Sequence, residues 1–258
     1  MFFNTWFQAR RGLVTGSTGW FGQHICRALY SMGAKYIDPF HTEKQDISNF
    51  RIPKEKIDYI IHLVPHHDVS RVIECAKKHD ALVLFTSSGA VYQDSKGAYG
   101  HMKVKNEKAF IDSGVRVKIA RCYTFAGTGI PLDVGFALGN FINSGLKGEN
   151  IRIWGNGKAI RTYLYMSDLV EWLFKILIDG TIGKPYDVGG EEQVTILELA
   201  EMVRNHFTSS KIVIENGRND RIPVYVPNLD NAYELGCRIK VPLVEAINRT
   251  VDYYKEQE

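Results

Sequence analysis

GLVTGSTGWFG, running from Gly12 to Gly22, is the stretch of sequence that decides the fold. The run GLVT has the character of a buried strand, and the residues around and after the last glycine have the spacing of an amphipathic helix. In this setting, glycines at positions 16, 19 and 22 permit a tight turn, a close approach of a pyrophosphate and close packing of the helix. Backbone amides and the helix dipole can then hold the phosphates. We interpret the stretch as a dinucleotide-binding turn, with a purely structural glycine turn as the alternative.

Short apolar runs and helical patterns keep alternating through the first half of the chain. Such alternation favours a parallel β-sheet that is covered by helices on both faces. The predicted strands are residues 12–15, 34–37, 57–64, 81–88 and 115–121, and the predicted helices are 20–32, 69–79 and 98–113.

The pattern changes after Arg121. Gly-rich loops surround a helical pattern at 135–148 and a short strand pattern at 151–154. An apolar helix pattern follows at 167–180, with Ser167 or Asp168 at its start.

These patterns predict an α/β protein with a Rossmann-like, doubly wound parallel sheet and a smaller C-terminal substrate-binding portion. The dinucleotide-binding portion is predicted at 1–125, with 160–182 packing back on it. The substrate-binding portion is predicted at 126–159 and 183–258.

The composition is that of an ordinary globular protein: 258 residues, 45% hydrophobic and 24% charged, with a formal net charge of +3. Because lysines and arginines are spread through the sequence, we predict no nucleic-acid partner and favour acidic small molecules. The four cysteines have no paired spacing, which indicates neither a disulfide framework nor a zinc site and favours a reducing cytoplasm.

No run of sequence approaches the roughly eighteen apolar residues of a membrane span, so we predict no membrane partner. The N-terminal segment has its apolar residues before its arginines, the reverse of a secretory signal. We expect its aromatic residues to dock on the body of the protein or on a partner chain; they are Phe2, Phe3, Trp6 and Phe7.

TSSGAVYQDSKGAYGHMK, from Thr86 to Lys103, has the residue types of a redox site. Tyr99 and Lys103 would lie one turn apart on one helix face. A tyrosine with its usual pKa of about 10 is a poor base at neutral pH, but a nearby ammonium and an oxidised nicotinamide both favour the phenolate. The phenolate can then take a hydroxyl proton while hydride leaves the same carbon, and a serine can hold the oxygen. Taken alone, a Tyr-x-x-x-Lys pair is common enough to be an ordinary helix surface.

Several motifs together resemble the extended short-chain dehydrogenase/reductase superfamily, in its nucleotide-sugar epimerase/dehydratase branch. TGSTGWFG resembles its cofactor turn, IIHLV its strand beside the nicotinamide, and TSSGAVY with YGHMK its catalytic motifs. Segments of the second half are similar to those of its substrate half, in the same order: GNGKAIRTYLYMSDLVEWL, KPYDVGGEEQVTILELAEMV and PNLDNAYELG. The likeness covers nearly the whole chain after Arg10, and it favours the redox interpretation.

The resemblance implies a catalytic set and a substrate class. Counting back from the VY pair places Ser88, rather than Ser87, at the catalytic serine, while Tyr99 matches the base and Lys103 the lysine that supports it. The implied partner is a nucleotide-diphosphate sugar, with Arg161 at a diphosphate-contacting position. The predicted substrate-binding residues are Ser88, Thr124, Asn140, Arg161 and Arg221, and for the two arginines a surface role is the alternative.

NAD is the predicted cofactor, with NADP as an open alternative. Asp38 follows a strand pattern and can accept ribose hydroxyls, which suits NAD, or it is a turn aspartate before Pro39. The resemblance implies that Asp46 approaches the adenine. From the local sequence alone, Asp46 is interpreted as a turn residue or a helix cap. The predicted cofactor contacts are Gly16, Thr18, Gly19, Trp20, Phe21, Gly22, Asp38, Asp46, Ile47, Leu63, Tyr99 and Lys103.

The chain also departs from the family pattern. Eleven positions separate Ser88 from Tyr99, and the segment after IIHLV is short as well, so the walls that usually surround the site are trimmed. Gly89 and Ala90 stand where family dehydratases carry an acidic residue or pair, so elimination of water lacks its acid and base. Thr124 stands where many relatives place Asn on the sugar nucleotide, which leaves the sugar and the base open.

His62, His66 and His67 raise the question of a metal site, because His-x-x-x-His puts two imidazoles together on a helix. Pro65 intervenes and IIHLV reads as a strand, so we predict loop histidines and no metal.

The first interpretation is an NAD-dependent nucleotide-sugar epimerase acting through a transient keto-sugar, in which hydride leaves a sugar carbinol and returns to its opposite face. An NAD(P)H-dependent nucleotide-sugar ketoreductase is the second, favoured by the compressed stretch from Asp38 to Asp46. A nucleotide-sugar-binding protein without turnover is the third, and a 4,6-dehydratase is disfavoured. We predict a cytoplasmic protein, with a homodimer as an open alternative.

Overall fold

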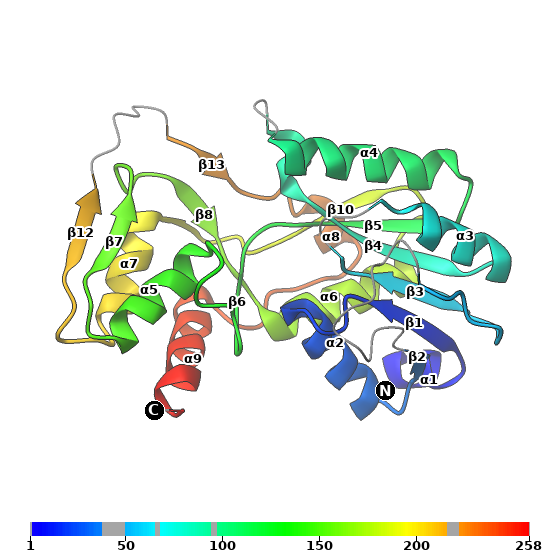
Figure 1. Ribbon diagram of the computed structural model, residues 1–258, viewed down its shortest axis with the longest axis horizontal. Coiled ribbons are helices and arrows are strands. Elements are labelled where there is room, and N and C mark those ends of the chain that lie inside the picture. Colours follow the sequence, from blue (N-terminus) through cyan, green and yellow to red (C-terminus); the bar gives the residue numbers. More distant parts are fainter. Residues whose placement is uncertain (1, 38–49, 65–67, 94–96, 216–221, 258) are drawn as a thin grey trace. The chain divides into compact units, whose positions relative to one another are not determined.

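The computed structural model describes residues 2–37, 50–64, 68–93, 97–215 and 222–257, which form two compact units (Figure 1). The first unit consists of Met1–Cys122, Val170–Val188 and Leu229–Cys237. The second consists of Tyr123–Leu169, Gly189–Asn228 and Arg238–Glu258.

A parallel sheet forms the middle of the first unit, and in the described part of the chain its strand order is β10-β5-β4-β3-β1-β2. The order reverses between β1 and β3, because the chain runs from β1 out to β2 and returns on the other side of β1. In doubly wound folds this switch point is where the carboxyl ends of the strands receive a ligand. The Rossmann-like α/β prediction is confirmed. The strands are β1 (Arg11–Thr15), β2 (Lys35–Ile37), β3 (Tyr59–His62), β4 (Leu82–Ser88), β5 (Val117–Cys122) and β10 (Pro185–Val188).

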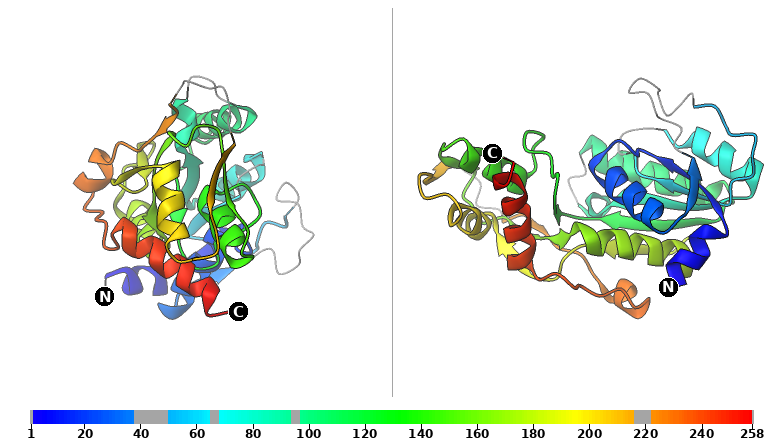
Figure 2. Two further views of the ribbon diagram at one scale, coloured as in Figure 1. Left: turned by 90° about the vertical axis from the view of Figure 1, so that its left-hand side faces the viewer. Right: turned by 90° about the horizontal axis from the view of Figure 1, so that it is seen from below.

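Helices cover both faces of this sheet (Figure 1). On one face lie α3 (Ser70–His79) and α4 (Ala98–Asp112). On the other lie α1 (Phe2–Gln8), α2 (Trp20–Ser31) and α6 (Met166–Asp179), which the view from below presents in front of the sheet (Figure 2).

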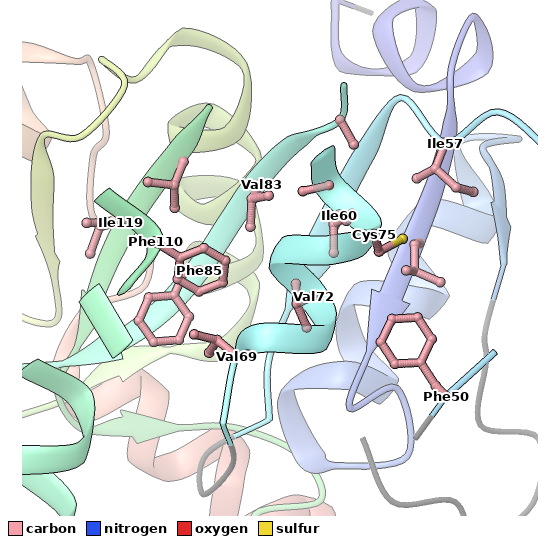
Figure 3. Close-up of a cluster of buried hydrophobic side chains, with 14 residues drawn as sticks. Phe50, Ile57, Ile60, Val69, Val72, Cys75, Val83, Phe85, Phe110 and Ile119 are labelled. Carbon is pink, nitrogen blue, oxygen red and sulfur yellow. The ribbon is translucent and has the colours of Figure 1, made fainter. Parts of the chain in front are cut away.

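Alternating side chains on the strands fill both layers, because successive residues of a strand point to opposite faces. Ile60 of β3 joins the buried cluster beneath α3 and α4, together with Phe85 of β4 and Phe110 of α4 (Figure 3). The rings of Phe85 and Phe110 lie 5.0 Å apart, centroid to centroid. Tyr59, one residue before Ile60, contacts α1 on the other face. This apolar packing fixes the strand register, and with it the sheet edge at which the predicted site residues begin.

The aromatic N-terminal segment docks on the body of the protein, the first of the two expected alternatives. Phe7 is fully buried, with its ring centroid 4.7 Å from that of Phe174 in α6. Trp6 lies 5.3 Å from the ring of Tyr59. Within the described ranges, neither α1 nor any other helix is long and apolar enough to cross a membrane.

The second unit is built around three helices that contact one another: α5 (Ala137–Leu146), α7 (Ile196–Arg204) and α9 (Leu243–Lys255). Helices α5 and α7 also contact β7 (Ile151–Trp154), which pairs in parallel with β12 (Ile212–Glu215). Two further small sheets join β11 (Gln193–Thr195), β8 (Ile160–Thr162) and β13 (Val224–Tyr225), and β6 (Phe125–Ala126) with β9 (Leu164–Tyr165).

Asp168, expected at the start of its helix, has a different role. Helix α6 begins at Met166, and the buried carboxylate of Asp168 accepts hydrogen bonds from the backbone amides of Lys240 and Val241 at 2.8 and 3.0 Å. It therefore joins two segments of the second unit that are more than 70 residues apart in the sequence.

The two units differ from the predicted portions at particular elements. Strand β10 belongs to the first unit because it pairs with β5, and α8 (Asp230–Glu234) joins it there by contacting β10. Residues 160–169 belong to the second unit. The cofactor-binding and substrate-binding roles of the units stay predictions.

Candidate active site

The glycine turn lies at the switch point of the sheet, where β1 and β3 end side by side. The amide of Leu63 donates to the carbonyl oxygen of Thr15 at 3.0 Å. A Cβ placed on Gly16 would lie 3.3 Å from the Cβ of Leu63, and Gly16 has a φ of +81°, which favours glycine. The structure therefore brings two predicted cofactor contacts, Gly16 and Leu63, next to each other.

Gly22 lets the first turn of α2 lie directly against this turn. A Cβ on Gly22 would lie 2.0 Å from the carbonyl oxygen of Gly16 and 2.5 Å from the Cα of Ser17, so any side chain there would displace backbone. The amino end of α2 consequently sits at the sheet edge, where helix amides can bind phosphate. This close approach fits a dinucleotide pyrophosphate.

Apart from Tyr99 and Lys103, the remaining predicted cofactor contacts divide into two groups. In the turn, Thr18 and Gly19 are exposed, while Trp20 and Phe21 are half-buried, with ring centroids 5.7 Å apart. Asp38, Asp46 and Ile47 lie outside the described residues.

Strand β4 delivers Ser88 to the same carboxyl edge of the sheet. Its side chain begins the short 3-10 helix η2 (Gly89–Tyr92), because Ser88 Oγ accepts a hydrogen bond from the amide of Ala90 at 3.2 Å. Ser88 is buried, so its hydroxyl has a defined place at the end of the strand.

Helix α4 carries Tyr99 in its first turn and Lys103 one turn later, as predicted from their spacing. Lys103 is 1% exposed, and its ammonium donates to the carbonyl oxygen of Thr86 at 2.8 Å. The same nitrogen lies 5.6 Å from the centroid of the half-buried Tyr99 ring and 4.9 Å from that of Phe85. Lys103 therefore connects Tyr99 to the strand that ends in Ser88.

Burial lowers the pKa of Lys103 to about 8, although the neighbouring Cys122 and Glu107 act to raise it. The loss of hydration disfavours the ammonium more than these two groups favour it. The Cys122 thiol is itself buried, which raises its pKa to about 12 against the lowering effect of the nearby Lys103. Lys103 is thus a lysine that can exchange its proton under mildly alkaline conditions.

A hydrogen-bonded group beside these residues was not predicted. Glu107 accepts two hydrogen bonds from Arg121, at 3.0 and 2.6 Å, and one from Ser87 at 2.5 Å. Arg121 also donates to the hydroxyl of Tyr92, which in turn donates to Asp187 at 3.2 Å. One sequence signal was available: Glu107 follows Lys103 by four residues, so both lie on one face of the helix.

The predicted substrate residues that the structure describes, apart from Ser88, lie in the second unit. Thr124 donates its hydroxyl proton to the carbonyl oxygen of Thr162, next to Arg161. Asn140 is exposed on α5, a separate element.

The guanidinium of Arg161 donates through Nη1 to the carbonyl oxygens of Ile160 and Pro223 at 2.8 and 3.1 Å, and lies 5.7 Å from the Tyr225 ring centroid. A guanidinium has further N–H donors that can reach a phosphate. Arg221 falls outside the described residues, and the substrate-binding roles of all these residues stay predictions.

The histidines do not form a metal cluster within the described part of the chain, where no group of three or more His, Cys, Asp or Glu side chains is arranged to hold a metal ion. His62 is buried at the end of β3, with its Nδ1 2.6 Å from the hydroxyl of Thr15 and its ring stacked on Phe85. His66 and His67 lie outside the described residues.

Comparison with known families gives one match over most of the chain. The model of the NAD dependent epimerase/dehydratase family matches residues 12–189. Among curated proteins, UDP-glucuronic acid decarboxylase 1 of Danio rerio is 26% identical over 307 aligned positions, which cover 96% of this chain and 73% of that protein. The alignment is longer than this chain, so the relative carries segments that the chain lacks.

Solved structures show the same fold at low sequence identity. UDP-glucose 4-epimerase of Thermotoga maritima, solved with UDP-glucose, has a TM-score of 0.80 and 19% identity, covering 96% of this chain and 99% of its own. UDP-glucuronic acid 4-epimerase of Bacillus cereus, solved with NAD and a fluorinated UDP-sugar, has a TM-score of 0.81 and 21% identity, covering 96% and 100%.

Proposed function

Because the chain belongs to the NAD dependent epimerase/dehydratase family, we propose that it is a nucleotide-sugar epimerase that acts through a transient keto-sugar. It is an enzyme, and NAD is its cofactor. When bound, NAD accepts a hydride from the sugar and can return it. The observation that carries the proposal is the place of Lys103, which joins the ring of Tyr99 to the strand that ends in Ser88.

In this proposal Tyr99 takes the proton of a sugar hydroxyl. The ammonium of Lys103 favours the phenolate form of Tyr99 by its charge. Ser88 hydrogen-bonds the same oxygen while it changes from hydroxyl to carbonyl, which holds the reacting carbon in a fixed orientation. On return of the hydride, Tyr99 gives the proton back, so the chain's residues end each turnover as they began it.

An epimerase needs no further acid or base, which agrees with the residues that follow Ser88. Gly89 and Ala90 offer no ionisable side chain for the removal of water from the neighbouring carbons. The proposal therefore favours epimerisation over dehydration.

A second candidate follows from the curated relatives. UDP-glucuronic acid decarboxylases match 96% of this chain, and oxidation of a carbinol next to the carbon that bears the carboxylate also promotes loss of CO2. Both candidates share the oxidation step that is assigned to Tyr99, Lys103 and Ser88.

UDP-glucuronic acid is the substrate that separates them. The purified enzyme with NAD should convert a UDP-sugar into an epimer of unchanged mass, followed by NMR and mass spectrometry, with UDP-glucose tested in parallel. Loss of CO2 from UDP-glucuronic acid would indicate a decarboxylase instead of an epimerase. Net consumption of NADH or NADPH would indicate a ketoreductase. Absence of turnover with UDP-, GDP-, CDP- and dTDP-sugars, with binding retained, would contradict the proposed epimerase.

We also propose a cytoplasmic location, which is supported by the four cysteines, none of which is paired in a disulfide within the described residues. A homodimer stays a prediction, to be tested by sedimentation.

A further inference from the structure

Tyr92 ends η2, four residues after Ser88, and its hydroxyl lies between two charged groups. It donates to Asp187 Oδ1 at 3.2 Å and accepts a hydrogen bond from Arg121 Nη1. The guanidinium carbon of Arg121 also lies 4.6 Å from the Tyr92 ring centroid. Tyr92 is therefore held through both its hydroxyl and its ring, although 55% of it is exposed.

The partners of Tyr92 belong to one row across the sheet. Ser87 of β4 is in register with Arg121 of β5, and Arg121 is in register with Asp187 of β10. Side chains in register on parallel strands point to the same face. Glu107 of α4 covers the row, because its carboxylate accepts hydrogen bonds from both Ser87 and Arg121.

This row of side chains contacts both elements of the candidate active site, the η2 turn that begins at Ser88 and helix α4, which carries Tyr99. In the sequence, Ser88 lies between two residues of this hydrogen-bonded set. Ser87 comes immediately before it, and Tyr92 ends the η2 turn that Ser88 begins. On α4, Glu107 continues the helix face of Tyr99 and Lys103 at the same four-residue spacing. The row therefore reaches both the serine turn and the helix that carries Tyr99.

We propose that Tyr92 is a positioning residue, whose hydroxyl, held by Arg121 and Asp187, fixes the η2 turn and through it the place of the Ser88 hydroxyl. The expected effect on turnover rests on the proposed function, whereas the effect on the turn does not.

The same contacts give Tyr92 a different role from Tyr99, the other tyrosine between Thr86 and Lys103. Burial and the charge of Asp187 raise the pKa of Tyr92, against the opposing effect of Arg121. Its proton is also committed to Asp187, so Tyr92 is unsuited to act as the base.

Tyr92→Phe tests the proposal, because it removes the hydroxyl and keeps the ring. The matched control is Tyr30→Phe on α2, a tyrosine that is 79% exposed. The first readout is amide hydrogen exchange at Ala90, whose N–H donates to Ser88, and at Gln93, whose N–H donates to Ala90. Both amides should exchange about tenfold faster in Tyr92→Phe, because hydrogen bonds to charged groups are lost. Exchange elsewhere, and everywhere in Tyr30→Phe, should stay as in the wild type.

The second readout is steady-state turnover. In Tyr92→Phe, kcat should fall by about tenfold while KM and the NAD dissociation constant change by less than about twofold. Asp187→Asn, which keeps a carbonyl acceptor for the Tyr92 hydroxyl, should lose less than Tyr92→Phe.

The outcomes are separable from those of the proposed function. Unchanged exchange at Ala90 and Gln93 would overturn the positioning role, as would faster exchange spread over the whole first unit. Local exchange as expected, with turnover unaffected in both Tyr92→Phe and Tyr99→Phe, would uphold the role of Tyr92 in the turn and contradict the proposed function.

Discussion

Replacing Lys103 by methionine should move the alkaline rise of activity to higher pH. Methionine fills a similar apolar volume at this buried position but carries no charge, so the change isolates the effect of the ammonium on Tyr99. In the wild type, burial sets the pKa of Lys103 at about 8, whereas tyrosine alone has a pKa of about 10.

The size of the shift follows from the distance between the two groups, because the Lys103 nitrogen lies 5.6 Å from the Tyr99 ring centroid. A nearby positive charge favours the phenolate. At this distance and an effective dielectric constant of about 20, one unit charge stabilises the phenolate by about 3 kcal/mol, which corresponds to about 2 pH units. Lys103→Met removes the charge, and the rise should move up by that amount.

The assay is kcat against pH, with NAD and nucleotide sugar kept saturating at every pH. Lys105→Met is the matched control, because it makes the same substitution at an exposed position of the same helix, and its profile should coincide with that of the wild type. An unchanged apparent pKa in Lys103→Met would refute the coupling between Lys103 and Tyr99.

Three further predictions concern the turn, the substrate and stability. Gly22→Ala would place a Cβ 2.0 Å from the Gly16 carbonyl oxygen, so NAD affinity by calorimetry should weaken by about 1–3 kcal/mol; unchanged affinity would remove the turn from the cofactor site. Arg161→Ala should weaken binding of UDP and spare NAD, since a guanidinium pairs two phosphate oxygens; equal UDP affinity would return Arg161 to a surface role. Lys118→Met should lower the free energy of unfolding by about 1–3 kcal/mol, because the buried Lys118 ammonium donates to two carbonyl oxygens at the end of α6, and an unchanged denaturation midpoint would contradict this.

Local patterns were sufficient to predict much of the first unit. The apolar run at 81–88 and the helical pattern at 98–113 correspond to β4 and α4. A continuous apolar run is typical of a strand that is buried on both faces, as β4 is from Val83 to Ser88, and apolar residues at helical spacing are typical of a helix with one buried face. The spacing of Tyr99 and Lys103 predicted their shared helix face for the same reason.

Contacts between distant segments could not be predicted in this way. The pairing of β10 with β5 depends on how the chain returns after α6, and the two amides bound by Asp168 come from residues more than 70 positions away. The group around Glu107 was missed for the same cause, since Arg121 and Asp187 meet only through strand register.

Proton removal by Tyr99 is the central claim, and the measurement that tests it most directly is the formation of reduced nicotinamide in a single turnover. Wild type and Tyr99→Phe would be mixed with the nucleotide sugar under saturating NAD, with NAD affinity measured separately for each. The account predicts that the absorbance of reduced nicotinamide no longer appears in Tyr99→Phe while NAD still binds with nearly wild-type affinity. Formation at the wild-type rate and with the wild-type pH dependence would contradict it.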